Sequence, residues 1–355
     1  MAIVDEPAEI REGEFLDNSA VEAFLKDTIR GLAGPLTIKQ FPSGFSNLTY
    51  FIRVGDRDLV LRRPPFGKKA KTAHDMNREY KILSALYPVF SYCPKPLVYS
   101  EDESIMGCPF YIMERIPGII LRKNLPKGMA LSPEKARMLC ENMIDLHCRL
   151  HALDYHAIGL GDFGKPEGYV KRQVDGWSKR YRDARTPDVP DFEPVMAWLD
   201  KNQLPDSQSS GIVHNDFKFD NLVLNPQNPL EIIGILDWEM STIGDPLMDL
   251  GNSLAYWINR DDPEEAQMLR LMPITIDGML TRKELVDLYA EKSGRKIKNF
   301  DFYYCFGLFR LAVIAQQIYY RYFHGQTKDK RFAKLVFAVA FLEKGAARVM
   351  DGGGI

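Results

Sequence analysis

The chain has 355 residues, more than one hydrophobic core usually holds, so two domains or lobes are expected. Its 46 basic and 48 acidic residues give a formal net charge of −2, which argues against nucleic acid or an anionic membrane surface as a partner. Three further features together predict a cytoplasmic protein with reduced thiols: five scattered cysteines without a CxxC pair, an acidic amino terminus without a signal-peptide pattern, and the lack of an apolar run long enough to span a membrane.

Predicted strands dominate the first third of the chain, after an N-terminal extension over residues 1–19. Apolar side chains at helical spacing predict helices, and runs of β-branched and aromatic residues predict strands. In chain order we expect a helix over 19–31, strands over 47–54 and 57–63 joined by a turn at 55–56, a helix over 73–86, and strands over 94–100 and 109–116.

Predicted helices dominate the rest of the chain, from Pro117 and Gly118 onward. The expected elements are a helix over 132–152, two short strands over 222–224 and 231–236, and a helix over 301–323. The change in composition at 116–118 predicts a boundary between an N-lobe, 20–116, and a C-lobe, 117–355. The predicted fold class is therefore α+β, a two-lobed fold with a small β-rich lobe followed by a larger, mainly helical lobe.

Polar residues between 214 and 237 form the strongest candidate for chemistry. Asp216 follows an apolar run, Asn221 comes five residues later, and Asp237 ends a hydrophobic strand. Singly, such residues are usually turn formers. If 221–237 forms a hairpin, however, the three side chains converge. Phosphoryl transfer from a nucleotide needs a carboxylate that orients the acceptor hydroxyl and oxygen ligands that hold Mg²⁺. Lys218 could add positive charge where the transferring group becomes negative.

The segments 214–221, 235–239 and 244–250 resemble the aminoglycoside phosphotransferase family, which has the protein-kinase-like fold. More narrowly, residues from about 20 to 345 are similar to kinase-like domains that occur fused ahead of certain acyl-CoA dehydrogenases. The resemblance implies ATP or GTP and Mg²⁺ as cofactors. It also implies that Asp216 is the catalytic base and that Asn221 and Asp237 are the Mg²⁺ ligands.

Other polar residues of the C-lobe are expected to have structural roles. The resemblance implies that His214 packs and bonds to the backbone, and that Asp245 and Asp249 brace the catalytic loop. His147 and His151 stand four residues apart on the predicted helix over 132–152, as metal ligands can. The chain offers no HExxH pattern there, so we interpret both as core or interface histidines rather than as a metal site.

The N-lobe is expected to bind the nucleotide, and the resemblance points to two sets of residues. Gly44, Ser46 and Asn47 lie between strand-like segments, where a glycine permits close backbone approach and the other two offer donors. Arg62 stands where the family usually has lysine, and Glu79 is similar to the glutamate that pairs with it. A guanidinium also binds phosphate, but its planar fork differs from an ammonium group, so this departure bears on the nucleotide pose.

The end of the last N-lobe strand resembles the hinge that holds the nucleotide base through backbone groups. Met113, Glu114 and Ile116 are the residues expected to contribute there. Backbone contacts leave little trace in side-chain types, so this expectation depends on the resemblance.

The predicted helix over 301–323 is dense in aromatic residues and carries Arg310, Gln317 and Arg321. One interpretation is a core helix in which Arg310 pairs with a buried acid. The other is a wall of the acceptor pocket in which Arg310 or Arg321 meets an anionic substrate. This half of the chain shows no obvious cluster of acids for a polycationic aminoglycoside.

Residues 157–166, AIGLGDFGKP, contain both a GxGxxG pattern and a DFG triplet. The segment follows a predicted helix rather than a strand, and it precedes Asp216 instead of following it. Neither context suits a nucleotide site, so we expect a loop near the acceptor mouth.

The sequence is compatible with three functions. The leading hypothesis is an ATP- and Mg²⁺-dependent phosphotransferase that acts on the hydroxyl of a small metabolite, in which a hydroxyacyl-CoA is one possible acceptor. The alternatives are an aminoglycoside or other antibiotic phosphotransferase and a catalytically weak, pseudokinase-like binding module. No nucleic acid or membrane partner is expected, and the sequence does not determine the oligomeric state.

Overall fold

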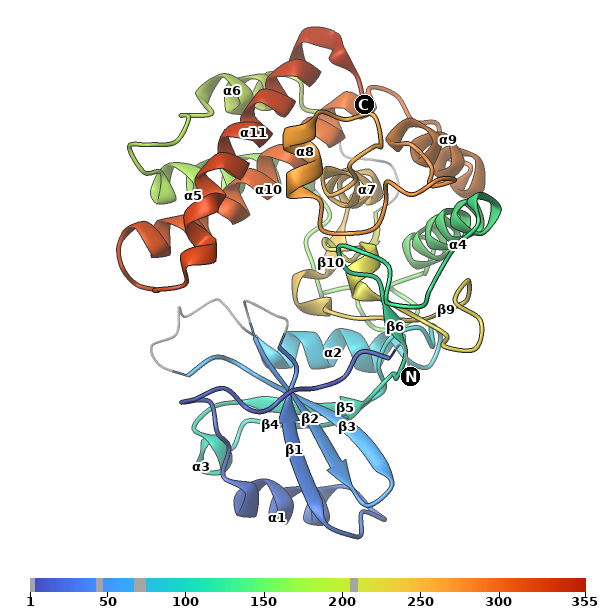
Figure 1. Ribbon diagram of the computed structural model, residues 1–355, viewed down its shortest axis with the longest axis vertical. Coiled ribbons are helices and arrows are strands. Elements are labelled where there is room, and N and C mark those ends of the chain that lie inside the picture. Colours follow the sequence, from blue (N-terminus) through green and yellow to red (C-terminus); the bar gives the residue numbers. More distant parts are fainter. Residues whose placement is uncertain (1–3, 43–46, 67–74, 205–209) are drawn as a thin grey trace. The chain divides into compact units, whose positions relative to one another are not determined.

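The computed structural model describes residues 4–42, 47–66, 75–204 and 210–355 (Figure 1). By packing, the chain divides into two compact units. Unit 1 holds the chain up to Ile120 together with Ile158–Leu160 and Asn221–Ser241, and unit 2 holds Leu121–Ala157, Gly161–Asp220 and Thr242–Ile355. Residues 221–241 thus pack with the first unit, although they follow the predicted boundary at 116–118 in the sequence. A single boundary therefore does not separate the two units. The predicted lobes 20–116 and 117–355 stay a prediction about functional domains.

Unit 1 is built on an antiparallel sheet of five strands in the order β1-β2-β3-β5-β4. Its helices α1, Asn18–Thr28, and α2, Met76–Leu86, match the predicted ones apart from their ends. The edge strand β1 was not predicted, because its alternation of apolar and polar residues covers only Leu36 to Lys39. The strands are β1 Leu36–Gln40, β2 Leu48–Val54, β3 Arg57–Arg63, β4 Pro96–Ser100 and β5 Phe110–Glu114, and a short helix α3, Glu103–Met106, precedes β5.

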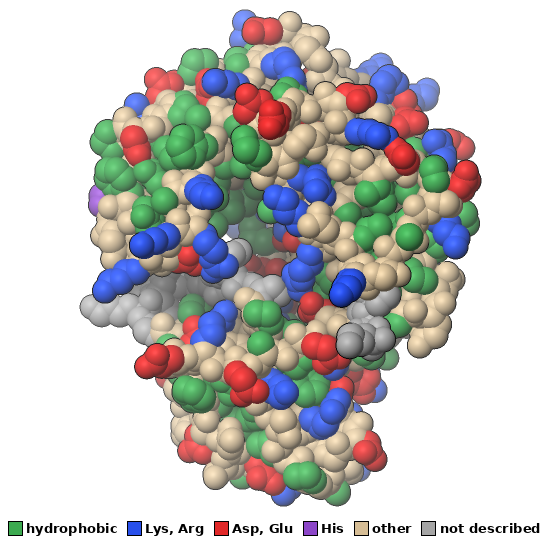
Figure 2. Space-filling model, viewed as in Figure 1, with side chains coloured by type: hydrophobic (Ala, Val, Ile, Leu, Met, Phe, Trp, Pro, Cys, Tyr) green, Lys and Arg blue, Asp and Glu red, His purple; other side chains and the backbone are tan. Residues whose placement is uncertain are grey.

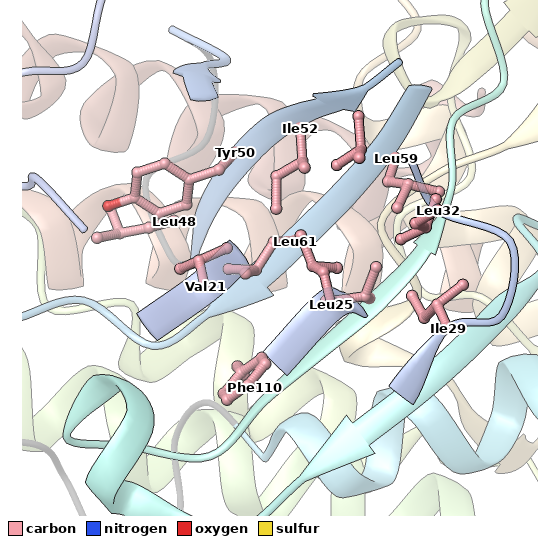
Figure 3. Close-up of a cluster of buried hydrophobic side chains, with 12 residues drawn as sticks. Val21, Leu25, Ile29, Leu32, Leu48, Tyr50, Ile52, Leu59, Leu61 and Phe110 are labelled. Atoms are coloured by element: carbon pink, nitrogen blue, oxygen red, sulfur yellow. The ribbon is translucent and has the colours of Figure 1, made fainter. Parts of the chain in front are cut away.

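Alternation along β2 and β3 decides which side chains enter the core of unit 1. Side chains two residues apart share one face of a strand, so Tyr50 and Ile52 on β2 and Leu59 and Leu61 on β3 form one apolar surface. Figure 3 shows this surface packed against Val21 and the other buried side chains of α1. The same alternation places Arg62 on the opposite face of the sheet.

A second, smaller sheet of unit 1 comes from residues far apart in the chain. Strand β6, Ile119–Ile120, pairs with β8, Leu222–Leu224, and β8 pairs with β9, Ile232–Ile235, in an antiparallel hairpin. The two strands predicted at 222–224 and 231–236 are therefore confirmed.

Unit 2 is mainly helical, which confirms the predicted α+β class. Its long helix α10, Phe300–Phe323, packs against α7, Pro246–Ala255, and α11, Leu335–Arg348. Glycines allow the closest contact, since a Cβ added at Gly307 would lie 2.2 Å from the carbonyl oxygen of Gly251. The other elements are α4 Pro133–His151, α5 Tyr169–Ala184, α6 Glu193–Lys201, α8 Glu264–Leu269, α9 Arg282–Ser293 and the paired strands β7 Gly211–Val213 and β10 Thr242–Gly244.

Basic and acidic side chains are intermingled over the molecular face in Figure 2, in keeping with the net charge of −2. All five cysteines are buried, and none of them forms a disulfide bond within the described part of the chain. No helix in the described part of the chain is both long and apolar enough to cross a bilayer.

Candidate active site

The loop after β7 carries the predicted catalytic aspartate within unit 2. Strand β7 is wholly buried, and His214 that follows it is buried as well. Asn215 has a positive φ of 64°, so the backbone turns sharply just before Asp216. Asp216 accepts hydrogen bonds from Lys218 Nζ at 2.8 Å on each carboxylate oxygen. The structure thus brings together the two residues that were predicted to act on the acceptor and the transferring group.

Lys218 remains charged although its side chain is largely buried. Burial opposes the charge, but Tyr256, Asp216 and Asp220 outweigh burial and raise the pKa of Lys218 above its ordinary value. The Lys218 Nζ lies 4.4 Å from the centroid of the Tyr256 ring, a cation–π distance. A fixed positive charge therefore sits beside the Asp216 carboxylate.

Asp249 holds the backbone of this loop in place. It is fully buried on α7, and its two oxygens accept hydrogen bonds from the backbone N–H of His214 and of Asn215, both at 2.7 Å. The Nε2 atoms of His147 and His151 lie 3.1 and 3.0 Å from Oδ2. This geometry matches the bracing role expected for Asp249. Asp245 caps α7 instead, accepting from the Leu247 N–H at 2.8 Å.

His147 and His151 are buried, as expected for core histidines, but they share an acid that spacing alone did not reveal. One ligand atom from each histidine and one from Asp249 lie within 4.8 Å of one another, close enough for a metal ion. Both Asp249 oxygens are already acceptors of backbone N–H groups, and His151 Nδ1 lies 2.7 Å from the Tyr289 hydroxyl. The atoms of the cluster other than His147 Nδ1 thus have partners within the protein, which favours a structural cluster.

The buried His151 predicts a pH dependence of stability. Burial lowers its pKa to about 3, with His147 adding to the fall and Asp249 opposing it. An unfolded chain takes up this proton near its ordinary pKa of about 6.5, while the folded protein does not. The stabilisation that comes from keeping His151 neutral is therefore fully present above about pH 6.5. As the pH falls from there towards 3, the free energy of unfolding decreases by up to about 1.4 kcal/mol per pH unit.

Urea unfolding measured between pH 5 and pH 7.5 tests this expectation. The His151→Gln variant should show a shallower loss of unfolding free energy on acidification than the wild type. His156→Gln, which changes an exposed histidine in the same unit, should keep the wild-type slope. An unchanged slope in His151→Gln would contradict the assignment.

A separate group of predicted site residues lies in unit 1, on the β8–β9 hairpin. The Leu236 N–H donates to the Asn221 carbonyl at 2.8 Å. The backbones of Asn221 and Asp237 therefore lie close together at one end of the paired strands β8 and β9. Asp237 has a φ of 68° and a ψ of 62°, a left-handed conformation that side-chain-bearing residues rarely adopt. Such strain persists where the surrounding structure enforces it, and it is common at functional sites.

Arg62 contacts three carboxylates, one of which belongs to Asp237. Its Nη1 donates to Glu79 at 2.6 Å, and its Nη2 lies 3.0 Å from an Asp237 oxygen and 3.4 Å from a Glu239 oxygen. Burial opposes the Arg62 charge, but Glu79 and Asp237 keep its pKa well above the ordinary value. The pairing of Arg62 with Glu79 that the resemblance implied is present, and the guanidinium extends to the predicted metal ligand.

Glu239 is a polar residue of this cluster that the sequence analysis missed. It accepts a hydrogen bond from Asn47 Nδ2 at 2.6 Å, which connects it to the segment before β2. The signal that could have found it is its place two residues after Asp237, in the short 3-10 helix Trp238–Met240 that follows the apolar strand. Gly44 and Ser46, predicted to contact the nucleotide with Asn47, lie outside the described residues.

Comparison with known proteins identifies the family of the chain. The sequence profile of the phosphotransferase enzyme family matches residues 37–280. The chain belongs to that family. The crystal structure of a putative aminoglycoside phosphotransferase from Ralstonia eutropha is 30% identical to this family member, with a TM-score of 0.79 and coverage of 95% of this chain and 99% of that one. Choline kinase from Cryptosporidium parvum is 12% identical with a TM-score of 0.61, covers 96% and 98% of the two chains, and shows the shared fold alone.

Curated relatives of this phosphotransferase-family chain are longer proteins. Acyl-CoA dehydrogenase family member 10 of Mus musculus is 38% identical over 90% of this chain, but the match covers 30% of that protein. Acyl-CoA dehydrogenase family member 11 of Rattus norvegicus is 35% identical over 93% of this chain and 43% of its own length. The chain thus spans less than half the length of these relatives, in agreement with the predicted resemblance to their kinase-like domains.

The predicted hinge of this phosphotransferase-family chain lies at the end of β5. Met113 is buried in the sheet, and the Glu114 N–H donates to the Lys95 carbonyl at 2.9 Å. Ile116 packs against Gly234 of β9, since a Cβ added to Gly234 would lie 2.8 Å from the Cδ1 atom of Ile116. These contacts describe the packing of the three residues, and their role in nucleotide binding stays a prediction.

The GLGDFG segment is a series of turns after α4, as expected. Gly164 packs closely on β10 of unit 2, since an added Cβ would lie 2.8 Å from the Ile243 nitrogen. Packing accounts for this glycine without a phosphate.

Proposed function

We propose that the protein is an ATP- and Mg²⁺-dependent phosphotransferase that acts on the hydroxyl of a small metabolite. The observation that carries this proposal is the buried Arg62–Glu79 pair extending to Asp237 within unit 1. A binding module without catalysis has no need for a strained aspartate beside a charged arginine, and this argues against the pseudokinase alternative. GTP in place of ATP is the other possible donor, since one fold neighbour, an aminoglycoside 2'-phosphotransferase, is a GDP complex.

Asn221 and Asp237 fit a magnesium site by the chemistry of their donors. Mg²⁺ prefers oxygen ligands, and the β8–β9 hairpin supplies an amide and a carboxylate from adjacent positions. When bound, Mg²⁺ neutralises charge on the nucleotide phosphates. Arg62 is proposed to contact the phosphates as well. Asn47, with Gly44 and Ser46, is proposed to cover them, and Met113, Glu114 and Ile116 are proposed to hold the base.

Asp216 is proposed to orient the acceptor hydroxyl and take its proton. The acceptor oxygen forms a bond to the γ-phosphorus while the bond from that phosphorus to the bridging oxygen breaks, and the nucleoside diphosphate leaves. Lys218, held charged between Asp216 and Tyr256, is proposed to stabilise the negative charge of the transferring group.

A CoA-linked hydroxyacyl group is the proposed acceptor class. Its support is the similarity to proteins named acyl-CoA dehydrogenase family members, in which a CoA thioester is the expected substrate. A screen of nucleoside diphosphate release against hydroxyacyl-CoAs, amino sugars and choline-like alcohols tests the acceptor. Turnover with amino sugars alone would replace this proposal by antibiotic modification.

Magnesium-linked nucleotide binding tests the metal ligands. Isothermal titration of the full chain with ATP should show much tighter binding with Mg²⁺ than without it. Asp237→Asn should lower this Mg²⁺ enhancement by about tenfold or more, because one anionic ligand is lost. Asp58→Asn, which changes an arginine-paired aspartate elsewhere in unit 1, should retain the enhancement. Equal binding with and without Mg²⁺ in the wild type would favour the binding module instead.

A further inference from the structure

Two guanidinium groups share one aromatic ring in unit 2. The Arg180 Cζ lies 4.6 Å and the Arg310 Cζ 5.1 Å from the centroid of the Trp177 ring. Trp177 and Arg180 belong to α5, and Arg310 belongs to α10, so the arrangement joins two helices. Two like charges close to the same ring repel each other, and a nearby anion would relieve this repulsion.

Three other basic side chains of α5 have carboxylate partners, while a fourth, Arg172, donates to the backbone carbonyls of Glu167 and Lys165. Lys171 pairs with Asp175 at 3.1 Å, Lys179 with Asp183 at 2.8 Å, and Arg182 with Glu193 at 2.7 Å. Within the described ranges, no carboxylate lies at ion-pair distance from Arg180. The acids of this helix are thus engaged by its other cations, and Arg180 keeps an uncompensated charge.

Arg310 also lacks a carboxylate partner within the described ranges, although it is buried. It is only 4% exposed, and among the residues that the structure describes it has no carboxylate partner. The expectation that Arg310 pairs with a buried acid was therefore wrong. A buried charge without a counter-ion is costly, and proteins usually pair such groups or use them to bind a ligand.

The charge of Arg310 acts on Tyr256, which contacts Lys218 of the catalytic loop. Burial raises the pKa of the Tyr256 phenol, and the charges of Lys218 and Arg310 oppose that rise. Tyr256 in turn contacts Lys218, which binds Asp216. Arg310 therefore belongs to the electrostatic surroundings of the residues that are proposed to meet the acceptor.

We propose that Arg180 and Arg310, on the Trp177 ring, form a subsite for a phosphate group carried by the acceptor. The inference deepens the proposed function and rests on it. Two fixed guanidinium charges match a dianionic phosphate better than a monocarboxylate, and the planar fork of each binds phosphate oxygens in pairs. The phosphate lies on a part of the acceptor remote from the reacting hydroxyl, so it contributes binding and orientation rather than chemistry.

Calorimetric titration with coenzyme A, a phosphate-bearing probe, tests the subsite. The full chain is first saturated with a non-hydrolysable ATP analogue and Mg²⁺, so that the nucleotide site is occupied. Arg180→Gln should weaken coenzyme A binding about tenfold or more, as expected for a lost charge-assisted contact. Arg310→Lys keeps the charge but loses the planar fork, so it should weaken binding by a smaller factor. Arg182→Gln, whose charge is already paired on the same helix, should change it less than about twofold.

Pantetheine, which has the same thiol arm without phosphates, should bind at least about tenfold more weakly than coenzyme A to the wild type. Wild-type affinity for coenzyme A in Arg180→Gln would overturn the subsite, as would a wild type that binds neither probe. Arg180 is exposed, so Arg180→Gln is expected to fold normally. Its affinity for coenzyme A therefore tests the subsite even if Arg310→Lys lowers the melting temperature. A failed subsite leaves the Mg²⁺-linked ATP titration unchanged, which separates this failure from that of the proposed function.

Discussion

Replacing Asp216 by asparagine is expected to lower the turnover number about 10²-fold or more. The asparagine keeps the shape of the side chain but cannot accept the acceptor proton, and it loses the charge that binds Lys218 Nζ through both oxygens. Nucleotide affinity should change far less, because the proposed nucleotide ligands are other residues. The measurement is kcat from nucleoside diphosphate release, with the best acceptor of the screen, alongside the ATP affinity.

Asp183→Asn provides the control for this experiment. Asp183 is exposed on α5 and pairs with Lys179, so its loss should leave kcat within about twofold of the wild type. Near-full turnover in Asp216→Asn, with an unchanged melting temperature, would contradict the role of Asp216 as base.

Asp249→Asn is expected to destabilise the protein by about 3 kcal/mol or more. Four donors converge on this buried carboxylate: the backbone N–H groups of His214 and Asn215 and the imidazoles of His147 and His151. An amide would turn its NH₂ group towards at least one of these donors. Because the two backbone groups belong to the loop that carries Asp216, kcat should fall together with the unfolding free energy.

Asp154→Asn is a matched comparison for Asp249→Asn. Asp154 also accepts two backbone N–H groups, from His156 at 3.0 Å and Ala157 at 3.1 Å, but it is exposed. Its replacement should cost less than about 0.5 kcal/mol. Urea unfolding at neutral pH measures both variants, and equal costs would show that Asp249 is not the organising acid.

Sequence patterns were enough to predict the elements that carry the candidate site. The two short apolar runs at 222–224 and 231–236 predicted strands, and the structure pairs them as β8 and β9. The predicted helix over 132–152 is α4, and the Ser132 hydroxyl at its start accepts the Lys135 N–H. These features are local, because strand alternation and helix capping act between residues close in the chain.

Only the tertiary structure decided which distant side chains meet. Asp249 contacts histidines 102 and 98 residues away, and Asn47 reaches Glu239 across 192 residues. Trp177 and Arg310 meet because α5 packs on α10. Residue types and spacing determined the family motif, the proposed base and the proposed metal ligands. The partners of Arg62, Asp249 and Arg310 depend on helix and strand packing, which local periodicity does not encode.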